Sequence, residues 1–381
     1  MDVATARSAM PITQNRIYLD HAAVGPLSGP CRDAMVDAAR DICEEGSTHL
    51  PQWWEAGDRG RSAFARLIGA GEDEIAYIKS TSQGLLLAAN GLPLGEGDRV
   101  VVCRGEFPAN VYPWLALRRK GVETRFLDPI GGRITVDLIR EGLDDTVKVV
   151  ALSYVQFGTG FRTDLDSIGS LCRERGITFV VDVIQGVGAM PLDVSRTPID
   201  MAAANGHKWM LGPEGVGFVY CRRELLDTLE PVHVGWLSVT DAMDFTEYDL
   251  TLRPDARRFE EGAPQTIPAA GLAASVEMLA GWGVEWISSR ILELTDVVIE
   301  EAERRGFEVL TPTARREERS GIVIASLGEV DHQVIADALR PRGVSVSTRG
   351  GGLRFSPHAY NTVDEVIHAF KAIDGVLLGD R

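Results

Sequence analysis

The chain has 381 residues, of which 45% are hydrophobic and 25% are charged, the balance of an ordinary globular protein long enough for two lobes. Its formal net charge is −16 and its pI is about 5.0, which argues against a nucleic-acid partner and against attraction to an anionic membrane surface. An anionic small ligand is not excluded, because a pocket can be locally positive inside an acidic protein.

Cysteine usage and the N-terminus bear on the cellular compartment. The five cysteines are scattered and form no Cys-x-x-Cys pair, which indicates free thiols in a reducing compartment rather than a disulfide framework or a zinc site. Residues 1–15 have no apolar core of signal-peptide length, and no apolar run approaches the roughly 20 residues of a membrane span. We therefore expect a cytoplasmic protein with no membrane span and no metal site.

The middle of the chain alternates short apolar runs with amphipathic stretches, which predicts an α/β fold with a mostly parallel central sheet and helices on both faces. Runs such as Phe179-Val180-Val181 are typical of strands buried on both faces. The helical pattern Leu165–Arg175 ends before Gly176, as a helix C-cap would. The predicted strands are Glu74–Ile78, Arg99–Cys103, Glu123–Leu127, Lys148–Ser153, Thr178–Asp182, Met201–Ala204 and Gly217–Tyr220.

The pattern of predicted strands and helices changes after about residue 250. A helix-rich stretch, Pro268–Arg305, is followed by short strands and by a closing helix over Asp364–Val376. We therefore predict a large domain over residues 16–264 and a smaller α+β C-terminal domain over residues 265–381, together with residues 1–15.

A strand-end acid and a strand-end amine suggest a cofactor site. Asp182 ends a predicted buried strand, Gln185 follows three residues later, and Lys208 follows another apolar run. Ligands of open parallel sheets bind beyond the carboxyl ends of the strands. An amine opposite a carboxylate there suits pyridoxal phosphate (PLP), because the amine condenses with the aldehyde and the carboxylate keeps the ring nitrogen protonated.

The phosphate and the ring of such a cofactor need further groups. The segment Lys79–Gly84 joins a strand to the apolar helix Leu85–Asn90, and hydroxyls and N–H groups at a helix N-terminus suit an anion. Phe107 follows the strand Arg99–Cys103, where a flat ring could stack on the pyridine. Near the C-terminus, Arg354 follows three glycines, and its guanidinium could bind a substrate carboxylate with two hydrogen bonds. Each of these features alone has a structural explanation, and only their combination indicates the site.

The combination resembles the class V aminotransferase family, the fold-type-I PLP enzymes that include cysteine desulfurases, selenocysteine lyases and isopenicillin N epimerase. Matching stretches run through most of the chain. They are Tyr18–Ala23, Ser80–Gly84, Val181–Gly186, Gly206–Trp209, Arg258–Gly262, Arg354–Ser356 and Tyr360–Thr362.

The resemblance implies a role for each matching residue. Lys208 would carry PLP as a Schiff base and then shuttle protons, Asp182 would pair with the ring nitrogen, and Gln185 would bind the phenolate oxygen. The substrate would contact Arg354, and a homodimer with shared active sites is implied. The other implied residues are Thr81, Ser82, Gln83, Asn205, His207 and the partner's Thr266 or Gln265 around the phosphate, Phe107 on the ring, and His21 and Ala22 on the substrate side. Arg349, in the loop before Arg354, is not part of the resemblance, and its position allows either a second cation on the substrate side or a solvated loop arginine.

Two departures from the family pattern bear on the reaction. The usual Thr after Glu-x-Gly is Ala263, so a phosphate contact from the partner chain must come from Gln265 or Thr266, or be absent. Desulfurases carry a nucleophilic Cys shortly before the carboxylate-binding Arg, but Val344–Gly350 contains none. Because persulfide chemistry needs a thiolate, ordinary desulfurase action is disfavoured.

The reaction itself is left open by the sequence. An aminotransferase acting on an amino acid is favoured, with β-elimination, as in a C–S lyase, and epimerisation as alternatives. A PLP-binding sensor or scaffold without catalysis is a rival of another class, which the presence of Lys208, Asp182 and Arg354 disfavours. A nucleotide-binding oxidoreductase is the least favoured alternative, because no G-x-G-x-x-G motif begins a helix after the first strand.

Overall fold

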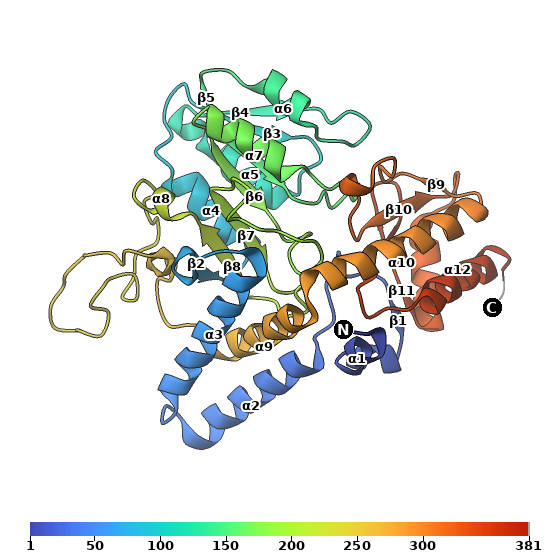
Figure 1. Cartoon of the computed structure of the whole chain (residues 1–381), viewed down its shortest axis with the longest axis horizontal. Helices are drawn as coiled ribbons and strands as arrows, with labels where there is room; N and C mark the ends of the chain where they lie inside the picture. Colours follow the sequence, from blue (N-terminus) through green and yellow to red (C-terminus); the bar gives the residue numbers. More distant parts are fainter. Residues whose placement is uncertain (380–381) are drawn as a thin grey trace.

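The computed structural model describes residues 1–379 and is built around a seven-stranded sheet (Figure 1). Only β8 runs antiparallel to its neighbours, so the predicted mostly parallel sheet is confirmed. The strand order is β2 (Ile75–Ile78), β8 (Gly217–Cys221), β7 (Met201–Asn205), β6 (Thr178–Asp182), β5 (Val147–Ser153), β3 (Arg99–Cys103) and β4 (Glu123–Leu127).

The central strands bury both of their faces, because successive side chains point to opposite sides of the sheet. In β3, Val101 and Cys103 pack into the core on one side, whereas Val100 and Val102 pack into the core on the other. The first core is covered by α3 (Leu50–Ile68), α6 (Val136–Gly142), α7 (Leu165–Glu174) and α9 (Thr266–Trp282), and the second by α4 (Thr81–Gly91), α5 (Tyr112–Ala116) and α8 (Arg223–Leu226).

The smaller lobe is a four-stranded antiparallel sheet backed by helices. Its core contains Phe355 and Phe370, whose rings stack with centroids 4.9 Å apart. A short parallel pair, β1 (Ile17–Tyr18) with β11 (Val344–Ser345), joins the N-terminal segment to this lobe. Its strands are β12 (Ser347–Arg349), β13 (Gly352–Phe355), β10 (Val323–Ser326) and β9 (Glu308–Val309), and its helices are α10 (Val284–Arg304), α11 (His332–Leu339) and α12 (Val363–Leu377).

Segments near the predicted lobe boundaries contribute to the cores of both lobes. Leu19 belongs to the core of the smaller lobe, although the large domain was expected to begin at residue 16. Leu272 and Val276 of α9 pack with the large lobe, where the helix lies against α3 and α2 (Gly29–Glu45). The helix-rich stretch is two helices, α9 and α10, bent by 81° at Gly283, whose φ is +83°. The exact domain boundaries stay a prediction.

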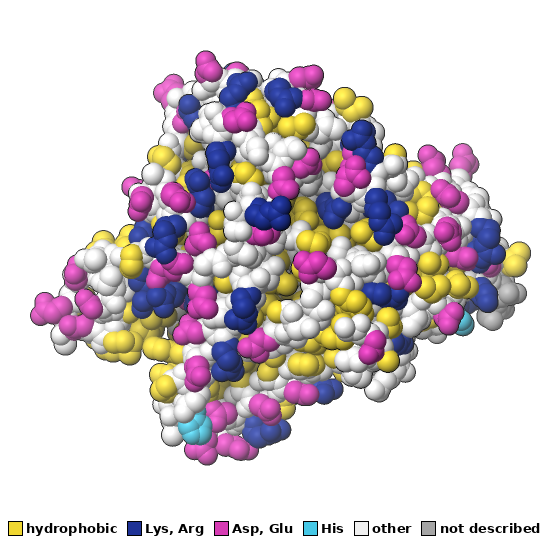
Figure 2. Space-filling view, in the orientation of Figure 1, with side chains coloured by type: hydrophobic (Ala, Val, Ile, Leu, Met, Phe, Trp, Pro, Cys, Tyr) yellow, Lys and Arg dark blue, Asp and Glu magenta, His cyan; other side chains and the backbone are white. Residues whose placement is uncertain are grey.

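The surface shown in Figure 2 carries intermixed acidic and basic side chains. No single helix within residues 1–379 has the length and hydropathy of a membrane span, and α9 and α10 meet that test only as a bent pair. The segment between β8 and α9 projects from the body at the left of Figure 1 and exposes several large apolar side chains, namely Trp236, Met243, Phe245, Tyr248 and Leu250.

Candidate active site

The carboxyl ends of β6 and β7 bring the predicted acid and amine to one edge of the sheet. Asp182 is the last residue of β6 and is buried, and Lys208 follows the end of β7 at Asn205. The Oδ1 of Asp182 accepts a hydrogen bond of 3.0 Å from the Ile184 N–H. Within residues 1–379, its Oδ2 accepts no hydrogen bond, so one oxygen of a buried carboxylate is left for a ligand.

Asp182 and Lys208 shift each other's protonation. Burial lowers the pKa of Lys208 to about 8, and the Asp182 carboxylate opposes this shift. Burial also raises the pKa of Asp182, with Lys208 acting in the opposite sense. The Lys208 Nζ lies 5.8 Å from the centroid of the Phe107 ring. A desolvated amine of this kind is neutral, and therefore nucleophilic, at a lower pH than an ordinary lysine.

This lowered pKa predicts the pH dependence of cofactor capture by the protein free of PLP. Only the neutral amine attacks an aldehyde, so the capture rate should rise about tenfold per pH unit below about 8 and level off above it. Stopped-flow absorbance after mixing with pyridoxal phosphate measures the rate. A Lys148→Ala variant, which removes an exposed lysine, serves as the control. A midpoint near the ordinary lysine value of about 10.4 would contradict a desolvated amine.

Gln185 is held by two partners in a fixed orientation. Its Oε1 accepts a hydrogen bond of 2.9 Å from the Trp209 indole N–H, and its Nε2 donates at 2.9 Å to the Ala22 carbonyl. Trp209 itself is buried directly after Lys208. One amide hydrogen of Gln185 is left for a ligand, in keeping with the predicted role toward a phenolate oxygen. Sequence reasoning missed Trp209 as the residue that fixes this amide.

The predicted phosphate residues meet at the start of α4. Thr81 is buried at the first position of the helix, and its Oγ1 accepts a hydrogen bond of 2.9 Å from the Asn205 N–H. The Asn205 Oδ1 lies 2.6 Å from the His207 Nδ1, while Ser82 is exposed beside them. Gln83 turns back and accepts a hydrogen bond from the Lys79 N–H at 2.7 Å. The helix N-terminus and these polar groups form one cluster suited to an anion.

Glu106, next to Phe107 in the chain, is a buried glutamate whose role sequence reasoning missed. Glu106 accepts hydrogen bonds from the Ser153 N–H at 2.8 Å, the Gln156 Nε2 at 2.6 Å and the Asn110 Nδ2 at 3.1 Å. It precedes Phe107, which is 46% exposed and available for stacking. An acid three residues after the end of the buried strand β3 was the available signal. Glu106 therefore anchors the Phe107 segment to the end of β5.

Arg354 is 2% exposed and lies on β13. Its guanidinium meets the Asp20 carboxylate at 3.4 Å, and its Nε donates to the Ser347 Oγ at 3.2 Å. Its other terminal nitrogen donates to the Phe157 carbonyl at 3.4 Å. The two 3.4 Å contacts are long for charged or N–H donors, so the guanidinium retains capacity for a carboxylate. Asp20, which pairs with Arg354, lies in the matching stretch Tyr18–Ala23, but the sequence alone gave it no role.

His21 and Ala22 lie beside this group without offering polar side-chain atoms to it. The His21 Nδ1 is 2.8 Å from the Ser356 carbonyl, and its Nε2 is 2.8 Å from the Tyr360 hydroxyl. Burial lowers the pKa of His21, and its ring stacks on Trp209 with centroids 5.9 Å apart. Both nitrogens are therefore occupied by the protein, and His21 supports Trp209. Direct contact of His21 with a substrate stays a prediction.

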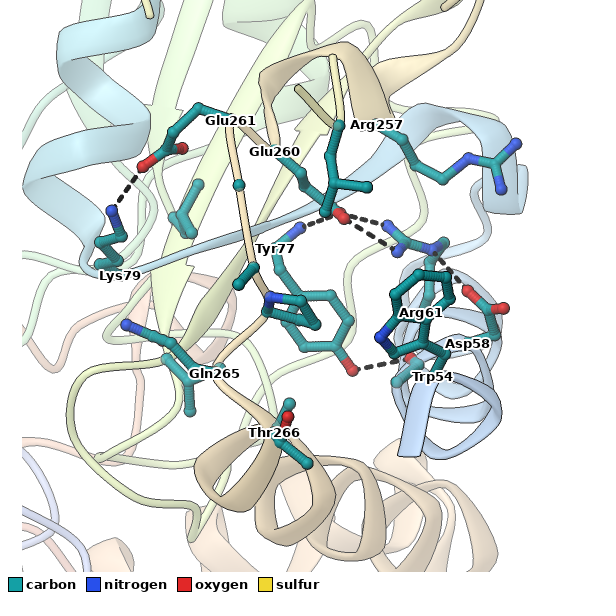
Figure 3. Close-up of a pocket in the computed structure, with 18 of the residues that line it drawn as sticks. Trp54, Asp58, Arg61, Tyr77, Lys79, Arg257, Glu260, Glu261, Gln265 and Thr266 are labelled. Atoms are coloured by element: carbon teal, nitrogen blue, oxygen red, sulfur yellow. Dashed lines mark hydrogen bonds and ion pairs between the residues drawn. The ribbon is translucent and has the colours of Figure 1, made fainter. Parts of the chain in front are cut away.

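Thr266 lies apart from Lys208, in the wall of a cavity of about 340 Å³ (Figure 3). Gln265 also lines this cavity, together with Lys79 and Gln83 of the phosphate loop. The segment that contains Thr266 is fixed by Glu260, which pairs with the buried Arg61 and accepts a hydrogen bond of 2.8 Å from the Tyr77 N–H. The cavity therefore borders the phosphate loop through Lys79 and Gln83.

The residues present fit pyridoxal phosphate. A buried carboxylate with one free oxygen shares the site with a desolvated amine, an exposed ring lies near that amine, and an anion site opens at a helix N-terminus. These are the groups needed for the ring nitrogen, the aldehyde, the ring face and the phosphate. The fold and this site together define a fold-type-I PLP-dependent enzyme.

Comparison with known proteins identifies the family. The model of the family described as "Aminotransferase class-V" matches residues 17–368, and the chain belongs to this family of PLP-dependent enzymes. A "Probable cysteine desulfurase" of Methanothermobacter thermautotrophicus is 28% identical, with 96% of each chain covered. The "Uncharacterized aminotransferase YcbU" of Bacillus subtilis is 27% identical, with 96% of each covered. A solved C-DES mutant with glycine covalently linked to its PLP cofactor has a TM-score of 0.90 at 22% identity, covering 96% of this chain and 98% of that one, and shows the fold.

Proposed function

We propose that the protein is a PLP-dependent C–S lyase that cleaves the bond between the β-carbon and sulfur of a cysteine derivative. The observation that supports this choice is the lack of a thiol in the hairpin that faces Lys208. Among residues 1–379, the cysteines are Cys31, Cys103, Cys172 and Cys221, all buried, and Cys43, exposed on α2. A relative of desulfurases without a sulfur-accepting cysteine would release the sulfur together with its substituent.

Each site residue has a role in this proposal. Asp182 would hold the ring nitrogen in its protonated form, Gln185 would bind the phenolate oxygen, and Phe107 would cover the ring. The phosphate would be held by Thr81, Ser82, Gln83, Asn205 and His207. When bound, pyridoxal phosphate supplies the electron sink that stabilises negative charge on the substrate's α-carbon.

The chain's own groups would carry out the proton transfer. Arg354 would bind the substrate's α-carboxylate and fix the orientation of the α-carbon. The Lys208 amine, whose pKa burial lowers to about 8, would remove the α-proton. The bond to sulfur would break with its electron pair leaving on sulfur, which takes up a proton to form a thiol. The remaining three-carbon fragment would be hydrolysed to pyruvate and ammonia.

Transamination is the second candidate, and one comparison favours it, since a relative covering 96% of the chain is named an aminotransferase. It would need the same α-proton removal by Lys208, but the substrate would give up its amino group and leave as a keto acid instead of losing a group from its β-carbon. Epimerisation would return the proton to the opposite face of the α-carbon. The three reactions therefore differ in what happens after one shared step.

Product analysis separates these reactions. We expect the PLP-loaded protein to convert S-substituted cysteines to pyruvate, ammonia and a free thiol in equal amounts, measured by coupled pyruvate assay and thiol titration. Alanine, which has no β-leaving group, serves as the control and should give no pyruvate through this route. Formation of the pyridoxamine form with a keto acid would instead establish an aminotransferase, and stereochemical inversion alone would establish an epimerase.

We also infer that the protein forms a homodimer. The projecting segment between β8 and α9 exposes Phe245, Tyr248 and Leu250, with Tyr248 97% exposed. Such a concentration of exposed apolar side chains marks an interaction surface. The segment runs into the wall of the cavity in Figure 3, through Leu237 and Arg253, so a second copy packed there would border the phosphate cluster.

A further inference from the structure

The hairpin of β12 and β13 presents two arginines on one face. Ser347 lies opposite Arg354, and its Oγ donates a hydrogen bond of 2.6 Å to the Asp20 Oδ1. Thr348 points the other way, and its Oγ1 donates at 2.7 Å to Gln333 on α11. Because side chains alternate along a strand, Arg349 lies on the same face as Ser347 and Arg354. Arg349 pairs with Gly352, which has no side chain to fill the space across from it.

The hairpin is fixed against the large lobe close to the site. At Gly350, where φ is +59°, a Cβ atom would lie 2.2 Å from the Gly158 carbonyl oxygen. Arg354 reaches the neighbouring Phe157 carbonyl, and the Phe157 ring contacts Phe107 with centroids 5.2 Å apart. The turn next to Arg349 therefore packs against the loop that contains Phe157 and Gly158. The ring of Phe157 contacts the ring of Phe107, which lies near the Lys208 amine.

The two arginines differ in their partners. Arg354 has the Asp20 carboxylate, which is also held by Ser347. Arg349 is exposed, and within residues 1–379 its guanidinium has no acidic partner and donates only to its neighbouring Thr348 carbonyl. Its charge nevertheless acts on Lys208, Asp20 and Arg354. The substrate side of the site thus holds one guanidinium with a counterion and one without.

We propose that the site selects an amino acid with a second anionic group at the end of its side chain, which Arg349 binds while Arg354 binds the α-carboxylate. Combined with the proposed C–S lyase, on which this part rests, the substrate class is a cysteine whose sulfur substituent carries a carboxylate. A guanidinium with free N–H donors is the group that binds a carboxylate with two hydrogen bonds. Within residues 1–379, Asp20 forms no ion pair with Arg349, and its contacts are with Arg354 and Ser347.

The preference for an anionic side chain can be tested without any C–S cleavage. Glutamate and glutamine differ only by a carboxylate and an amide at the end of the side chain. Binding to the PLP-loaded protein, followed by the change in the visible absorption of the cofactor, should be about 10- to 100-fold tighter for glutamate. Arg349→Gln should remove this preference, and Arg349→Lys should keep part of it as a point charge. Arg140→Gln, an exposed arginine of α6, is the matched control and should keep the full preference.

A second pair of compounds connects the inference to the reaction. S-carboxymethylcysteine and its amide, S-carbamoylmethylcysteine, should both be cleaved by a C–S lyase, with kcat/KM higher for the acid in wild type and equal in Arg349→Gln. If glutamate is preferred through Arg349 but neither thioether is cleaved, the anion site stands and the lyase proposal fails. If both thioethers are cleaved equally well and Arg349→Gln changes nothing, the lyase stands and Arg349 is a solvated loop residue.

Discussion

Replacing Lys208 by alanine should reduce turnover of every amino-acid substrate by at least about 10³-fold, because in the proposed mechanism the same amine would attach the cofactor and remove the α-proton. The lowered pKa that burial gives this lysine suits both tasks. Pyruvate release by the purified PLP-loaded variant measures the effect. Lys148→Ala, at an exposed position of β5, is the control for loss of a lysine and should retain full activity.

A second substitution at the same position separates charge from nucleophilicity. Lys208→Arg keeps a cation of similar reach, but a guanidinium stays protonated and neither attacks an aldehyde nor accepts a proton. It should be as inactive as the alanine variant, and borohydride reduction should fix no cofactor to either. Substantial activity in Lys208→Arg would show that this position supplies only positive charge, and the mechanism would then be wrong.

Asp182→Asn should lower kcat by about 10²- to 10³-fold, because it removes the negative charge that we propose keeps the ring nitrogen protonated. The amide is nearly isosteric, and its Oδ1 can still accept the hydrogen bond from the Ile184 N–H, so the fold is retained. Steady-state kinetics should show a large fall in kcat with little change in KM, since the proposed substrate contact of Arg354 is unchanged.

The matched control for Asp182 is Asp193→Asn, an acid that caps a surface turn through Ser195 and lies outside the site. Circular dichroism should show the same secondary structure for wild type and both variants. If Asp182→Asn kept wild-type kcat, the carboxylate would have a structural role only. The proposal that Asp182 pairs with the ring nitrogen of pyridoxal phosphate would then be wrong.

Local patterns predicted the strands well, and for the central strands this is because their apolar runs are buried on both faces. Arg99–Cys103, Glu123–Leu127 and Thr178–Asp182 have the predicted bounds, and the others differ by at most one residue at an end. The pairing of residues distant in the sequence could not be predicted. Arg354 meets Asp20 across 334 positions, a contact that depends on how β1 joins the smaller lobe.

The helix-rich stretch shows a second limit of local patterns. Gly283 has helix-forming sequence on both sides, and its conformation depends on where each helix finds an apolar surface. α9 buries its side chains against α2 and α3, whereas the later turns of α10 bury theirs in the smaller lobe. The roles of Glu106 and Trp209 were missed for the same reason, since each depends on partners from other strands.

The sharp corner at Gly283 also bears on how the two lobes that carry the site residues are connected. Lys208 belongs to the large lobe and Arg354 to the smaller one, and the two helices that meet at this glycine link those lobes. Its backbone angles, φ +83° and ψ +124°, are costly for any residue with a side chain. A single residue about 70 positions from either group therefore fixes the corner between the two helices that connect the lobe of Lys208 to the lobe of Arg354.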